Sequence, residues 1–287
     1  MLNSSQFALE TGVWFFMSTT GCLSVFINFF GVYLIIYHHG VMDDYRYYLL
    51  FFQCILLIFD FYFTLLMIPI PLFPLIGGYS IGVLTDYFGI STHKQMVFAL
   101  WCLGNTNTCI FISLLKRHQV VAAIEQRNIV KPIMYKTTVV CSYFLPSFGT
   151  LVFAFSQPDQ QTTRKIIEHK YPSDLWILNI PGIAIYDIDI NLNPIFYWIT
   201  YGIMIGSITL ITCYLIIYSQ LHLMLRSLKL RISNLTYNKH RVAIASTVIQ
   251  NVVFMVFFII PMIILAIVIW FGVDASGNIW LLAEYQM

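Results

Sequence analysis

The chain has 287 residues, of which 59% are hydrophobic and only 10% are charged. Soluble domains average about 25% charged residues, and the apolar residues here form long blocks, so a soluble globular fold is excluded. The net charge of +2 comes from basic residues that flank these blocks, and they form no separate basic domain of the kind that binds nucleic acid. The composition therefore predicts a polytopic membrane protein with a single membrane domain over residues 1–287.

The first half of the chain holds three apolar blocks, each long enough for the roughly 20 helical residues that cross a bilayer. Residues 13–37 form the first predicted span, and the basic n-region of a cleaved signal peptide does not precede it. The second span, 47–73, ends in a proline-rich stretch at 69–74, which cannot continue a regular helix. The third span, 95–115, runs directly into the basic residues at 116–118.

The second half of the chain holds three further predicted spans, at 137–156, 195–219 and 242–271. A long loop of mixed charge, 157–193, separates the fourth and fifth spans, whereas the loop at 220–241 is basic and contains no acidic residue. The sequence thus predicts an all-α bundle with six transmembrane spans.

The basic residues are divided unequally between the two sides of this bundle. Eleven of the 15 Lys and Arg residues follow spans one, three and five, and four lie on the other side. Since cytoplasmic loops carry the excess of Lys and Arg, we predict that the N-terminus lies outside the cell. Asn3, in an Asn-Ser-Ser sequon, is then available for glycosylation, whereas the sequon at Asn234 is cytoplasmic.

Polar side chains within the apolar blocks mark candidate sites. Asp60 lies deep in the second span, where an ionised carboxylate costs at least ~2.5 kcal/mol. It is either an ion or switch site or a structural hydrogen-bond partner of a neighbouring helix. Trp101, Asn105 and Thr108 share one face of the third span, which either lines a ligand cavity or makes interhelical hydrogen bonds.

The sixth span carries two further candidates. Asn251 is predicted to face the bundle interior as a buried polar residue. Pro261 removes a backbone hydrogen bond and is either a hinge in a two-state helix or a static kink.

Catalytic and metal chemistry is not indicated. The seven histidines lie at span ends or in loops without metal-ligand spacing along a helix. The sequence also lacks a nucleophile elbow and a phosphate-binding loop. We therefore expect neither enzyme activity nor a cofactor or metal, and a polytopic transporter remains as an alternative to a receptor.

Several short motifs, weak individually, occur in an order and spacing that are specific together. They are Phe29–Tyr37, Arg46–Leu50, Gln53, Asp60, Pro69–Pro74 with Gly78, Tyr79 and Gly82, Ile90–His93 and Lys116–Gln119. Taken together they resemble the nematode serpentine chemoreceptors of class I, with class H as the near relative. The likeness extends over about residues 12–271.

The resemblance implies a seven-helix, G-protein-coupled chemosensory (olfactory) receptor in the plasma membrane of sensory neurons, at their cilia. A small-molecule ligand is then expected in the outer half of the bundle, and Pro261 matches the hinge proline of span six. A heterotrimeric G protein is expected at the inner end. The predicted G-protein contacts are Lys116, Arg117, His118, Arg226, Lys229 and Arg231.

The chain departs from the family pattern in two ways. The family has a seventh span, and we expect a chain shortened before that span. Rhodopsin-like receptors usually carry an outer-loop cystine, and none of the six cysteines is placed to form one. The alternative to a signalling receptor is a transporter or a non-signalling membrane protein.

Overall fold

The computed structural model describes residues 4–37, 45–72, 75–157, 159–170, 172–187, 189–229 and 232–256, together with positions 260 and 263. Three predicted site residues, Asn3, Arg231 and Pro261, lie outside the described residues. The end of the sixth predicted span also lies outside them.

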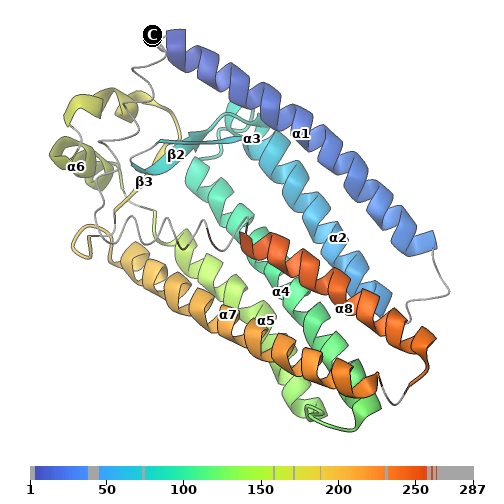
Figure 1. The fold of residues 1–287 in the computed structure, drawn as a ribbon. Coiled ribbons are helices and arrows are strands. Elements are labelled where there is room, and N and C mark those ends of the chain that lie inside the picture. Colours follow the sequence, from blue (N-terminus) through green and yellow to red (C-terminus); the bar gives the residue numbers. More distant parts are fainter. Residues whose placement is uncertain are drawn as a thin grey trace, which may run out of the picture.

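The described residues form a bundle of long helices that run side by side in alternating directions (Figure 1). These helices are α1 (Ser4–Tyr37), α2 (Tyr45–Phe61), α4 (Thr92–Glu125), α5 (Pro132–Ala154), α7 (Pro194–Leu228) and α8 (Asn234–Phe254). Within the described residues, α1, α2 with its extension, α4, α5 and α7 are long and apolar enough to cross a bilayer, and α8 contains the shorter apolar stretch Ile244–Val253. The chain is therefore a polytopic helical membrane bundle, as its composition predicts.

Helix α4 lies at the centre of the bundle. More than half of its most apolar stretch is buried, against less than a fifth in each of the other candidate spans. It packs against α2, α5, α7 and α8. It also extends past the predicted bound at residue 115 to Glu125, because the apolar face continues through Val121 and Ala122, which are buried against α7 and α8.

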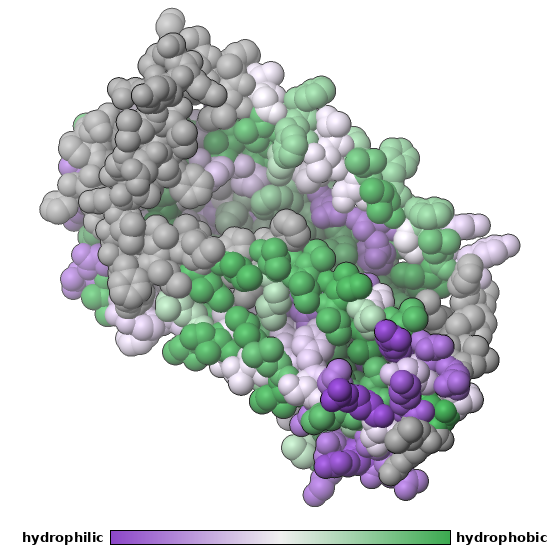
Figure 2. Space-filling model, viewed as in Figure 1, coloured by the Kyte–Doolittle hydropathy of each residue, from purple (hydrophilic) through white to green (hydrophobic). Residues whose placement is uncertain are grey.

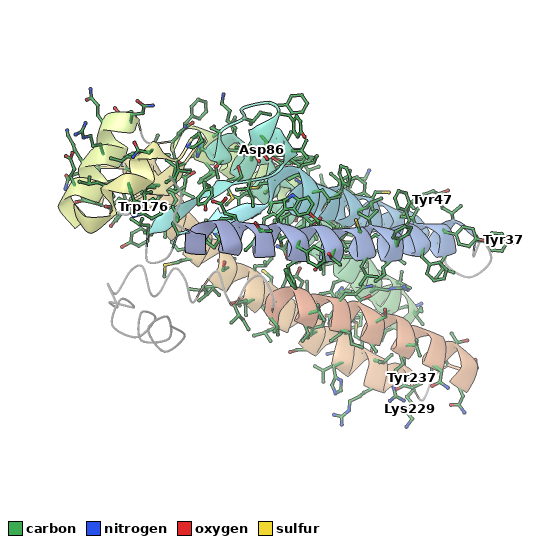
Figure 3. The ribbon with its side chains drawn as sticks, turned by 90° about the horizontal axis from the view of Figure 1, so that it is seen from above. Tyr37, Tyr47, Asp86, Trp176, Lys229 and Tyr237 are labelled. Carbon is green, nitrogen blue, oxygen red and sulfur yellow. The ribbon has the colours of Figure 1, made fainter. Side chains whose placement is uncertain are left out.

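The bundle has two different ends. At one end, which we call the cap end, lie the short helix α3 (Val83–Asp86), the helix α6 (Gln160–Lys170), the 3₁₀ helix η2 (Pro172–Asn179) and a small sheet. At the other, the basic end, lie the connections from α1 to α2, from α4 to α5 and from α7 to α8. Figure 3 shows this division, with Asp86 and Trp176 at the cap end and Tyr37, Tyr47, Lys229 and Tyr237 at the basic end.

The sheet at the cap end consists of β1 (Pro69–Pro71), β2 (Ile76–Ser80) and β3 (Ala184–Tyr186), paired antiparallel in the order β1-β2-β3. The proline-rich stretch thus forms an edge strand, where the missing N–H groups are tolerated. Helix α2 continues as a π-helical segment, η1 (Tyr62–Met67), and ends before residue 73, because a residue that precedes proline is disfavoured in a helix.

Two glycines allow the strands of this sheet to approach closely. A Cβ atom on Gly77 would lie 2.2 Å from the carbonyl oxygen of Ala184, and one on Gly78 would lie 2.3 Å from that of Ile70. Both neighbours are backbone atoms of the paired strands, so they cannot move without breaking the sheet. These positions in the sheet therefore require glycine.

Candidate functional site

Strand β3 connects the cap to the bundle. All three of its residues, Ala184, Ile185 and Tyr186, are buried. Ala184 and Tyr186 pack in one apolar cluster with residues of α4, α5 and α7, including Phe153 and Phe196. The long loop before α7 therefore passes into the space between three helices instead of lying over them.

A buried histidine fixes this strand in place. The His93 Nε2 atom lies 3.2 Å from the carbonyl oxygen of Ala154, and Nδ1 lies 2.5 Å from the Tyr186 hydroxyl. Since a carbonyl can only accept, Nε2 carries the proton and donates, and Nδ1 accepts from Tyr186. Burial raises the pKa of the Tyr186 phenol, which stays a neutral donor. The contact joins the first turn of α4, the end of α5 and β3.

The contact between His93 and Tyr186 joins α4 to β3 without a covalent bond. All six cysteines are free, so no disulfide connects β3 to α4. Aromatic rings complete the junction, with the His93 and Phe153 centroids 5.0 Å apart and the Tyr186 and Phe196 rings stacked at 4.8 Å. The sequence contained no local signal for this pair, because 93 residues separate His93 from Tyr186.

The cap has an apolar core of its own. Leu75, Ile166, Ile167, Ile177 and Ile185 are buried together there, from the sheet, α6 and η2. The cap is also joined to α1, because the Tyr79 hydroxyl donates to Glu10 Oε1 at 2.6 Å. Burial, together with this hydrogen bond, raises the pKa of Tyr79. The stretch predicted as the loop 157–193 thus contains α6, η2 and β3, which pack into this core.

Asp60 lies in a polar cluster between α1 and α2. Its Oδ2 atom accepts from Ser24 Oγ at 2.5 Å and from Asn28 Nδ2 at 2.6 Å. Gln53 Nε2 in turn donates to Asn28 Oδ1 at 2.6 Å. These contacts are those of the structural alternative for Asp60, a hydrogen bond to a neighbouring helix. Ser24 and Asn28 lie four residues apart in one apolar block, and this spacing is the sequence signal that could have identified them as partners of Asp60.

The predicted ligand-binding face of α4 packs against α5. Trp101 Nε1 donates to Ser147 Oγ at 3.3 Å, and Thr108 Oγ1 donates to the carbonyl oxygen of Ser142 at 2.8 Å. Asn105 is buried and donates to the carbonyl oxygen of Trp101 within α4. Contacts to α5 of this kind fit the interhelical alternative for Trp101 and Thr108.

A different face of α4 forms a polar seam with α7 and α8. Tyr214 of α7 donates to Asn107 Oδ1 at 3.3 Å, and Asn251 of α8 donates to the Tyr218 hydroxyl at 2.5 Å. The Tyr214 and Tyr218 rings are stacked with centroids 6.2 Å apart. Asn251 was expected to be buried and is 1% exposed. Two tyrosines four residues apart in an apolar block were the available signal for the other members.

The seam continues toward the basic end through His118. This side chain is 3% exposed, and its Nε2 atom donates to Gln220 Oε1 of α7 at 2.8 Å. His118 is therefore enclosed between helices, unlike a residue on a docking surface. Its neighbours Lys116 and Arg117 are half-buried, because α4 extends about 12 Å beyond Arg117 to Glu125.

The basic end presents exposed cations. Arg226 and Lys229, at the end of α7, are exposed, and Figure 2 shows hydrophilic residues gathered at this end of the visible face. A buried acidic residue lies at the same end of the bundle. Glu125, at the end of α4, is only 9% exposed, and its Oε2 atom has no hydrogen-bond partner among the described residues.

The described residues contain no group of three His, Cys, Asp or Glu side chains that could hold a metal ion. Several buried polar side chains bond to one another across helix pairs. Such an arrangement can couple the positions of the helices from the cap end to the basic end.

One comparison with known proteins gave a match. A family model described as serpentine type 7TM GPCR chemoreceptor Sri matches residues 6–283. Neither the comparison with curated proteins nor that with solved structures gave a match.

Proposed function

Because the chain belongs to the serpentine type 7TM GPCR chemoreceptor Sri family, we propose that it is a chemosensory receptor that couples a small-molecule ligand to a heterotrimeric G protein. The proposal includes the class I assignment and a location in the plasma membrane of sensory neurons, at their cilia. It also includes an N-terminus outside the cell, with Asn3 glycosylated. The cap end is then extracellular, and the basic end is cytoplasmic.

The observation that supports this proposal is the polar seam between α4, α7 and α8. Its hydrogen bonds, Asn107 with Tyr214, Tyr218 with Asn251 and His118 with Gln220, link three helices at successive depths. Helix α4 also carries His93 at the cap end. A ligand that displaces β3 or the outer part of α4 thus has a contiguous set of contacts through which to bias two helix arrangements.

Loss of the seam is expected to change signalling in the absence of ligand. Asn251→Ala removes the hydrogen bond to Tyr218, loosens α8 from α7 and raises basal G-protein signalling severalfold in a reporter cell that reads calcium or cyclic nucleotide. Tyr237→Phe, near the start of α8, serves as the control at equal surface expression. Basal signals that match the unaltered receptor in both variants would argue against the seam as the switch.

Arg117 tests the contact with the G protein. Arg117→Ala is expected to leave surface expression intact and to abolish coupling, because the guanidinium lies toward the proposed cytoplasmic end of α4. Unchanged signalling in this variant would show that Arg117 does not contact the G protein, and the contact proposed for the adjacent Lys116 would be abandoned with it. Arg226 and Lys229 would then remain as the exposed candidates.

A transporter would use Asp60 differently. In the receptor proposal Asp60 holds α1 against α2 through Ser24 and Asn28. Proton- or ion-coupled uptake into vesicles that depends on Asp60 would favour the transporter and count against the receptor.

A further inference from the structure

The first turns of α5 and the connection before them carry exposed cations beside exposed apolar side chains. We call this surface the α5 foot, and its residues are Arg127, Ile129, Lys131, Ile133, Met134 and Lys136. The three apolar members are 56%, 72% and 57% exposed, respectively. None of the six belongs to the polar seam or the predicted G-protein contacts.

The charge of the α5 foot is not compensated within the described residues. Arg164 forms an ion pair with Glu168 at the cap end, and none of the three cations of the foot pairs with a carboxylate among the described residues. Between residues 126 and 136 the chain has no acidic residue, and the preceding Glu125 is buried. Three cations therefore face outward from the foot, and their electrostatic complement is an anionic surface.

The position of Lys136 on α5 decides which anionic surface fits. At helical spacing Ile133, Lys136, Val140 and Phe144 lie on one side of the helix, and the last two are 67% and 62% exposed. That side is the lipid-facing surface of a membrane helix. The Lys136 ammonium can extend along it toward the headgroups while its methylene groups stay in apolar surroundings.

We propose that the α5 foot binds the headgroup of an anionic phospholipid in the adjoining leaflet. Arg127, Lys131 and Lys136 attract the phosphate and any further negative charge, while Ile133 and Met134 contact the start of the acyl chains. The lipid holds the connection between α4 and α5 against the bilayer. The inference rests on the proposed function only in that a cytoplasmic basic end faces the leaflet rich in anionic lipid.

The test is lipid retention by the purified full chain, without ligand or G protein. The chain is offered mixtures of phosphatidylserine and phosphatidylcholine in micelles, and bound lipids are counted by native mass spectrometry. We expect phosphatidylserine to be retained preferentially. The triple variant R127Q/K131Q/K136Q is expected to lose that preference by at least about tenfold, since each cation near an anionic surface contributes roughly fivefold.

Two controls separate charge from side-chain identity and from place. R127K/K131R/K136R keeps the charges and is expected to keep the preference. K94Q/K165Q removes two exposed cations at the cap end and is expected to change nothing. Single K136Q, whose side chain is exposed, is expected to give a partial loss and keeps the test informative where the triple variant does not fold.

Three results would overturn the inference. The first is a triple glutamine variant that retains phosphatidylserine as the unaltered chain does. The second is full competition by soluble glycerophosphoserine, which would make the foot a site for free phosphate esters. The third, read in a separate G-protein activation assay on the triple variant, is unchanged lipid retention with reduced activation, which would make the foot a protein contact. Because lipid retention itself is measured without any signalling readout, a chain that fails as a receptor can still pass the lipid test.

Discussion

The cap end and the basic end use their side chains in opposite ways. At the cap end, segments far apart in the sequence share a sheet, an apolar core and hydrogen bonds such as His93 with Tyr186 and Tyr79 with Glu10. At the basic end, the helices end in exposed cations, and the buried carboxylate of Glu125 lacks a partner for one oxygen among the described residues. The cap end thus holds its own segments together through contacts within the chain, whereas the basic end presents exposed groups for external partners.

The largest effect is expected where the cap has no room for change. Gly77→Ala places a Cβ atom against the carbonyl oxygen of Ala184, and we expect a loss of ~3 kcal/mol or more in the free energy of unfolding. Thermal unfolding of the purified chain measures it. Gly149→Ala is the matched control, because a Cβ atom there meets nothing within 4 Å. Equal melting temperatures for the two variants would show that the sheet is not rigid.

The next effect concerns the contact that connects the cap to α4. His93→Phe leaves the Tyr186 hydroxyl and the Ala154 carbonyl without their shared partner, which costs about 1–3 kcal/mol for each buried polar group. Tyr186→Phe removes only one hydroxyl and should cost less. We expect the double variant to be less destabilised than the sum of the single variants, as measured in a thermal double-mutant cycle. Strictly additive effects would mean that the two side chains do not interact.

The polar cluster at Asp60 is expected to give a smaller loss. Asp60→Asn keeps an oxygen acceptor for Ser24 and Asn28 but removes the charge that strengthens both hydrogen bonds. We expect a loss of about 1 kcal/mol in stability and unchanged basal signalling at equal surface expression. Altered signalling with unchanged stability would instead support Asp60 as the switch that its place in the sequence suggested.

The sequence was sufficient for the helices but not for their partners. Blocks of apolar residues predicted the all-α membrane bundle, and the ordered motifs predicted the serpentine chemoreceptor family; both are confirmed. The sheet was missed because prolines at 69 and 71 indicated only a break in a helix. Strand β2 pairs with β3, and Gly78 and its partner Ala184 are more than a hundred residues apart in the sequence. Local patterns carry helix periodicity, whereas pairing across such distances depends on the assembled fold.

The candidate site follows the same division. The sequence identified Asp60, Asn105 and Asn251 as polar residues within apolar blocks, and Asn105 and Asn251 are buried. Hydropathy does not reveal which helix each polar side chain meets. The face of α4 chosen for ligand contact therefore packs on α5, and Asn107, which lies off that face, belongs to the seam.

The smallest effect is expected from a substitution of Glu125, which should raise the stability of the chain, whereas the preceding substitutions lower it. A carboxylate at a helix C-terminus is opposed by the helix dipole, and burial adds a cost for an unpaired charged oxygen. Glu125→Gln removes the charge with little change in shape, so we expect stability to rise by about 0.5–1 kcal/mol in thermal unfolding without a partner. Asp86→Asn, on an exposed side chain at the cap end, is the control. If Glu125→Gln lowers stability instead, a cation within the chain already compensates the carboxylate, and the contrast between the two ends would not extend to this residue.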